Sequence, residues 1–195
     1  MNKLERAIKN MVEELRKLEE KQDETLREGR EITRMCANAV KKIHARDIEG
    51  AGRDLEKIKR RVGALKKVGT EFPHIITQTL QEYAEIAIFL SIVKRRDVPT
   101  HEELGVDFAD YILGLCDVVG ELKREMLEEL RAGNVKNAEY YFTKMNEIYE
   151  ATLPLRFSDS ILPGFRKKQD AMRYQLEQAR GIILEHSLGR SRGGR

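Results

Sequence analysis

The sequence predicts an all-α protein. Only 4 prolines occur in 195 residues, and long stretches repeat apolar side chains every three or four positions. Charged residues make up 35% of the chain and hydrophobic residues 41%, a balance typical of helices with one buried and one charged face. No stretch alternates apolar and polar residues as a half-buried strand does. We therefore expect a helical domain without strands.

Composition also limits the setting of the protein. Cys36 and Cys116 are far apart and form no CxxC pair, so we expect two reduced thiols in the core of an intracellular protein. Residues 1–10 are charged and lack a signal-peptide pattern. The longest apolar run, residues 86–93, is too short to span a bilayer. We expect a cytoplasmic protein with no membrane partner.

The first helix is predicted over residues 2–44. Its first half is heavily charged but carries a narrow apolar seam, formed by Leu4, Ile8, Met11, Leu15 and Leu18. Such a seam suits a partner helix, which could belong to the same subunit or to another copy. The second half of this helix is more apolar, so we expect it to enter the core.

The second and third helices are predicted at residues 53–68 and 73–95, after a turn at 46–52. Gly69 is a candidate C-cap and Pro73 a candidate first residue of the third helix. Beyond a polar connection, Thr100 and Glu103 have the spacing of a capping box. The later helices are expected around residues 110–130, 135–153 and 164–186. The domain would thus span residues 1–187, followed by a disordered Gly/Arg-rich tail at 188–195.

Residues 110–121, DYILGLCDVVGE, form the most unusual stretch. It is apolar nearly all the way round, so the helix should be buried on most sides, yet Asp117 and Glu121 lie four residues apart on one face. Gly114 and Gly120 each destabilise a helix by about 1 kcal/mol relative to alanine. We therefore expect that the space at these glycines is needed by a neighbour.

A second acidic pair, Glu82 and Glu85, lies three residues apart in the other strongly apolar helix. The pairs could be partly exposed acids that are neutralised by lysine or arginine. Alternatively, the two helices pack face to face and the four carboxylates converge. Carboxylates that lose hydration beside one another need a counter-charge. Convergence of the four carboxylates would therefore predict a bound cation.

Four carboxylates without an adjacent histidine form a hard oxygen site, which suits Mg²⁺ or Mn²⁺ better than zinc. A di-iron bundle would require two Glu-x-x-His motifs. The one match, residues 71–74, contains a proline and lies at a helix start. A partly open Mg²⁺ site is suited to phosphodiester hydrolysis.

Basic residues gather between residues 41 and 67, where ten positive and four negative side chains give a net charge of +6 against +3 for the whole chain. Such a segment is typical of a surface that binds a polyanion through its backbone. It could equally be a solvated helix face with pairs such as Glu56 and Arg60. The candidate contacts are Lys57, Arg60, Arg61, Lys66 and Lys67.

The motifs LQEYAE and DYILGLCDVVGEL resemble those of the translin family, and its TRAX branch more closely than translin itself. The likeness extends to the FPHIITQTLQEY entry of the third helix and to GFRKKQDAMRYQLEQAR in the last. It implies about seven helices, a closed octamer-like shell with an inward catalytic face, and a metal-dependent endoribonuclease acting on single-stranded RNA. Carried over by position, the catalytic and metal-binding acids are Glu82, Glu85, Asp117 and Glu121.

The chain also departs from the family pattern. It lacks a basic nuclear-targeting extension, its last helix is translin-like, and translin's RNA-contact segment is reduced to little more than His74. A homo-oligomer from a prokaryotic source, such as an archaeon, would explain this combination.

Three hypotheses follow. The first is a Mg²⁺-dependent (or Mn²⁺-dependent) endoribonuclease. The second is a translin-like protein that binds single-stranded RNA or DNA without cutting it. The third is a structural helical protein whose acids pair with internal cations.

Overall fold

The computed structural model describes residues 2–192, and of residues 187–192 the backbone alone. Within this range the chain forms seven α-helices, one 3-10 turn and no strand, which confirms the predicted fold class. The elements are α1 Lys3–His44, α2 Ile48–Val68, η1 Gly69–Glu71, α3 Pro73–Val93, α4 His101–Leu104, α5 Phe108–Arg131, α6 Val135–Thr152 and α7 Phe165–Arg192.

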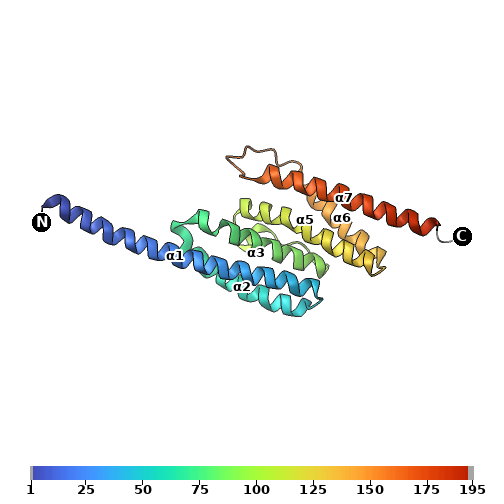
Figure 1. The fold of residues 1–195 in the computed structure, drawn as a ribbon, viewed down its shortest axis with the longest axis horizontal. Helices are drawn as coiled ribbons and strands as arrows, with labels where there is room; N and C mark the ends of the chain where they lie inside the picture. The colour runs from blue at the N-terminus through green and yellow to red at the C-terminus, as the bar shows by residue number, and fades with distance from the viewer. Residues whose placement is uncertain (1, 193–195) are drawn as a thin grey trace.

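Helices α3 and α5 form the centre of the bundle (Figure 1). The pair α1 and α2 packs on α3, and the pair α6 and α7 packs on α5. The apolar character of α3 explains its place, since its buried side chains include Tyr83, Ile86, Ile88 and Phe89. A helix that is apolar on all sides is stable only when neighbours cover all sides.

Gly114 sets the spacing between α3 and α5. A Cβ atom at this position would lie 2.5 Å from the backbone oxygen of Gln81 and 3.0 Å from Cβ of Ala84. The expectation that a neighbour needs this space is confirmed. For Gly120 the same expectation is wrong, because a Cβ there would lie 3.6 Å from Nε2 of Gln175, an ordinary van der Waals contact.

The first half of α1 extends away from the bundle (Figure 1). All five residues of the predicted apolar seam are exposed, Leu4 by 69% and Leu15 by 62%. In the second half of α1 the same three-and-four spacing continues through buried positions, which are Thr25, Gly29, Ile32, Cys36, Ala39 and Ile43. One face of α1 is therefore covered by the bundle over half its length and open to solvent over the other half.

Two predicted boundaries differ from the structure. Helix α2 begins at Ile48 rather than at residue 53, because the side chain of Asp47 caps it by accepting a hydrogen bond of 2.9 Å from the Gly50 amide. Helix α7 continues to Arg192, so residues 188–192, which we predicted to be disordered, are helical. Extending an existing helix needs no new nucleus. Residues 193–195 of the predicted tail lie outside the described residues.

The other predicted ends agree with the structure. Pro73 opens α3, Gly69 is the C-cap residue of α2, and Thr100 with Glu103 forms the predicted capping box. Among the described helices, none is long and apolar enough to cross a membrane.

Candidate functional site

A pocket of about 260 Å³ lies between α1, α3 and α5, and we call it the acid pocket. Its lining residues are Cys36, Ala37, Val40, Lys41, Glu82, Glu85, Glu121 and Arg124. The structure thus brings together three of the four predicted acids from two helices. Asp117 lies one turn before Glu121 on α5, close enough to Glu85 for its charge to act on that carboxyl.

Glu85 is the most perturbed acid of the site. Burial, followed by the negative charges of Asp117 and Glu121, raises the pKa of Glu85 to about 8. Within the described residues its carboxylate has no hydrogen bond or ion pair, whereas Glu82 accepts a hydrogen bond of 3.1 Å from Nε2 of Gln78. Glu85 is therefore a half-buried carboxyl among other carboxyls without a protein counter-charge of its own.

Asp117 is paired with a residue that the sequence did not indicate. Nζ of Lys168, on α7, lies 2.5 Å from Oδ2 of Asp117. The same ammonium lies 3.3 Å from the backbone oxygen of Leu113 and 3.4 Å from Oε1 of Gln81. Helix α7 therefore delivers one positive charge to the edge of the acid cluster.

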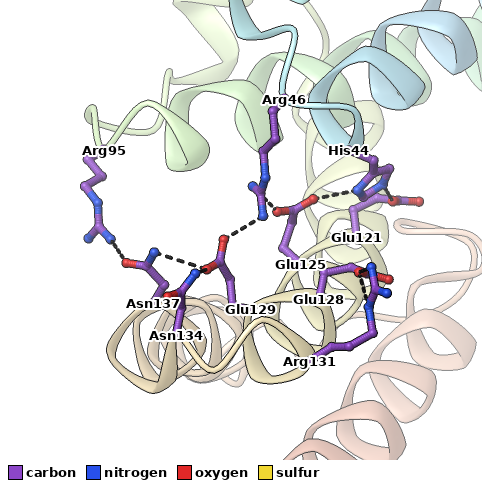
Figure 2. Close-up of polar contacts among 10 residues, drawn as sticks. All are labelled: His44, Arg46, Arg95, Glu121, Glu125, Glu128, Glu129, Arg131, Asn134 and Asn137. Carbon is purple, nitrogen blue, oxygen red and sulfur yellow. Dashed lines mark hydrogen bonds and ion pairs between the residues drawn. The ribbon is translucent and has the colours of Figure 1, made fainter.

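Glu121 is held by His44, the last residue of α1. Nε2 of His44 lies 2.6 Å from Oε2 of Glu121, and Nδ1 lies 2.6 Å from Oε1 of Glu125 (Figure 2). Burial opposes protonation of the ring, but the hydrogen bonds to the two carboxylates outweigh it and raise the pKa of His44 to about 9. The ring is therefore an imidazolium that donates to both acids at neutral pH.

The pairing continues beyond His44. Arg46 donates hydrogen bonds of 2.6 Å to both Glu125 and Glu129, and these carboxylates are 1% and 7% exposed (Figure 2). Arg46 adopts φ 65°, a left-handed conformation that is unfavourable for residues other than glycine. The bundle holds it there because the guanidinium neutralises acids that would otherwise be buried unpaired.

The acids of α5 therefore form a row, with Asp117, Glu121, Glu125 and Glu129 at successive intervals of four residues. The predicted site ended at Glu121 and did not include Glu125, Glu129, His44 or Lys168. The spacing signal for the two further acids was present in the sequence. Nothing local marked the two cations, which arrive from α1 and α7.

The acids of the pocket offer carboxylate oxygens, and its one sulfur, on Cys36, has a raised pKa, so the donor set fits a hard divalent cation. The observation that favours such an ion is Glu85, a half-buried carboxyl beside Asp117 and Glu121 that has no hydrogen bond or ion pair among the described residues. As the side chains lie, however, no group of three or more potential ligands among the described residues is arranged to hold a metal. Asp117 and Glu121 instead have protein cations as partners.

The two cysteines are free and buried, as predicted. Burial, with a smaller contribution from Glu82 and Glu85, raises the pKa of Cys36 to about 12. Burial likewise raises the pKa of Cys116 to about 12. Burial therefore keeps both thiols protonated near neutral pH.

The predicted basic contacts divide into two groups. Nε and Nη2 of Arg61 donate to both oxygens of Glu28, at 2.6 and 2.7 Å, which raises the pKa of Arg61. Lys66 donates to the backbone oxygen of Gly105. These two side chains thus help to hold the fold. The exposed candidates are Lys57, Arg60, Lys67 and His74.

The translin family model matches residues 1–188 of the chain. The chain belongs to the translin family. Protein MJ0175 of Methanocaldococcus jannaschii is 34% identical over 166 residues, which cover 83% of this chain and 74% of that protein. The predicted family resemblance is confirmed.

Solved structures share the translin fold seen here. AfC3PO is 28% identical with a TM-score of 0.85, covering 94% of this chain and 98% of that one. A complex of AfC3PO with duplex RNA matches with 26% identity, a TM-score of 0.85 and the same coverage. The apo form of NeC3PO has a TM-score of 0.84 at 24% identity, with 92% of this chain and 96% of that one covered, and supports the fold alone.

Proposed function

We propose that this translin-family protein is a metal-dependent endoribonuclease. The observation that carries the proposal is the acid pocket, where Glu82, Glu85 and Glu121 meet beside Asp117. A protein that needed these acids only for stability would pair each with a cation. Glu85 lacks such a partner within the described residues, and its pKa is raised to about 8.

The four acids would hold Mg²⁺ or Mn²⁺. Such an ion polarises a phosphate group and lowers the pKa of an attacking water. We propose that Glu85 orients and deprotonates that water, because among the described residues it is the pocket acid whose carboxylate has no hydrogen bond or ion pair.

RNA is the proposed substrate. Lys41 and Arg124 line the same pocket as the acids and are exposed, so they can neutralise the phosphates that flank the cleaved bond. The RNA complex of the AfC3PO relative supports this substrate class, although that RNA is a duplex. We propose single-stranded RNA as the cleaved form, because a flexible strand enters a narrow pocket more readily than a stiff helix.

We also propose that the protein acts as a closed homo-oligomer. The exposed seam on α1 supports this, because it continues the heptad spacing of the buried half of the same helix. Enclosure would place the acid pocket on an inner wall and exclude large duplexes.

The proposal is tested with labelled single-stranded and duplex RNA incubated with protein and Mg²⁺ or Mn²⁺. We expect cleavage of the single strand that stops on addition of a chelator. Glu85→Gln and Asp117→Asn should each lower the rate at least about a hundredfold. Glu128→Gln serves as a control, since Glu128 is an exposed acid of α5 that pairs with Arg131. Cleavage that survives both substitutions would contradict the assignment of Glu85 and Asp117 to the active site.

A translin-like protein that binds RNA without cutting it is the second candidate. The observation in its favour is that Asp117 and Glu121 already have cationic partners. It predicts salt-sensitive RNA binding together with the absence of metal-dependent cleavage in the same assay.

A further inference from the structure

Lys168 belongs to the site, yet neither the sequence pattern nor the proposed nuclease mechanism explains it. It comes from α7, whereas the acids lie on α3 and α5. Its ammonium lies 2.5 Å from Asp117 and within 3.4 Å of two further oxygen acceptors, on Leu113 and Gln81. The three ammonium protons therefore have three acceptors, and these contacts fix the position of the ammonium group.

Asp117 is one of the four acids proposed to hold the metal, and Lys168 already occupies its Oδ2. Two positive groups cannot share Oδ2 of Asp117 without repulsion. Binding of a metal by Asp117 therefore requires the ammonium to leave.

The two protein cations that pair with predicted acids of the site differ in how firmly they are held. His44 is fixed through both ring nitrogens, between Glu121 and Glu125. Lys168 has Asp117 as its ionic partner, its other two contacts are to neutral oxygens, and its side chain is 28% exposed. A lysine on a flexible four-carbon stem can move without disturbing the backbone. Exchange is therefore easier at Asp117 than at Glu121.

We propose that Lys168 is an exchangeable residue of the site: it pairs with Asp117 in the metal-free protein and moves to the substrate phosphate when Mg²⁺ or Mn²⁺ takes its place. The inference rests on the proposed nuclease function. It assigns the lysine two successive anionic partners, a carboxylate and then a phosphate. It also explains how repulsion among the acids is offset before the metal binds.

The test substitutes Lys168→Met, which keeps the length of the side chain and removes its charge. The matched control is Lys167→Met, because Lys167 is the adjacent lysine of α7 and is exposed. Mn²⁺ affinity is measured by calorimetry and by the metal-induced shift in melting temperature, and the cleavage rate is measured at saturating Mn²⁺.

We expect Lys168→Met to bind Mn²⁺ about tenfold or more tightly, because the competing charge is gone. We also expect its cleavage rate to fall at least about tenfold, because a phosphate contact is lost. Lys167→Met should change neither. A residue with a merely structural role would weaken metal binding and cleavage together, so the opposite directions identify the exchange.

The outcomes separate the two proposals. If the wild-type protein binds no Mn²⁺, the proposed function fails. If it binds Mn²⁺ but Lys168→Met binds no more tightly, the exchange at Asp117 is overturned. Unchanged cleavage by Lys168→Met would overturn the phosphate contact. A double substitution guards against misfolding: with Asp117→Asn present, removing Lys168 should give no gain in Mn²⁺ affinity, and a persisting gain would also contradict the exchange.

Discussion

At the scale of single residues, the site is defined by which acids have partners. Asp117 faces Lys168, Glu121 faces His44, and the acids farther along α5 face Arg46. Glu85 alone combines half-burial with like charges and a pKa raised to about 8. A raised pKa in a pocket is typical of a catalytic or binding residue.

Because the folded protein keeps the Glu85 proton up to about pH 8 and the unfolded chain releases it near 4.5, this group favours the folded state at low pH. Its contribution is lost as the pH rises from about 4.5 to 8. The urea concentration at the unfolding midpoint should therefore fall over this pH range in the wild type, and Glu85→Gln should make that fall smaller. His44, whose pKa rises from 6.5 to about 9, adds a separate decline between about pH 6.5 and pH 9, and this decline should remain in the variant.

The measurement is urea unfolding of both proteins between pH 5 and pH 9 without metal, with Glu128→Gln as the control. The prediction fails if Glu85→Gln and the wild type lose stability in parallel up to pH 8.

At the scale of elements, the site depends on how closely α3 and α5 approach. Gly114 allows the backbone of Gln81 to come within a distance that no side chain at 114 would permit. This contact lies one turn from Glu85 on α3 and one turn from Asp117 on α5. Gly114 therefore allows the acids of α3 and α5 to approach one another, although it takes no part in the chemistry.

We expect Gly114→Ala to destabilise the protein by about 1–3 kcal/mol, since the added methyl group forces the two central helices apart. Mn²⁺ affinity should fall with it. Gly120→Ala is the matched substitution on the same helix, and it should be neutral or stabilising by up to about 1 kcal/mol, because only ordinary contact with Gln175 results. Chemical unfolding of the two variants distinguishes them, and equal effects would contradict the close-packing account.

At the scale of the whole molecule, the dominant feature is the half of α1 that projects from the bundle (Figure 1). Its apolar seam shares the spacing of the buried half, yet no helix within residues 2–192 of the subunit covers it. We expect a second copy to do so. The acid pocket lies beside the buried half of the same helix, so α1 connects the proposed assembly face with the proposed active site.

Leu15→Glu should therefore lower the native mass of the particle, since a charge in the middle of the seam opposes helix pairing. Asn10→Glu adds the same charge away from the seam and should leave the mass unchanged. Light scattering coupled to gel filtration measures both. A wild-type protein that is already monomeric, or a Leu15→Glu variant of unchanged mass, would contradict the assembly.

The sequence by itself determined the helical class, most helix ends and the two acidic pairs, because these depend on local spacing along single helices. The identity of the counter-charges was decided only by the tertiary structure. Lys168 and His44 lie 51 and 77 residues from the acids they contact, and no local pattern links residues so far apart. Whether a carboxylate meets a cation depends on which helices pack together. Here that packing left Glu82 with a neutral amide as its partner, and left Glu85 as the acid of the site without a hydrogen bond or ion pair among the described residues.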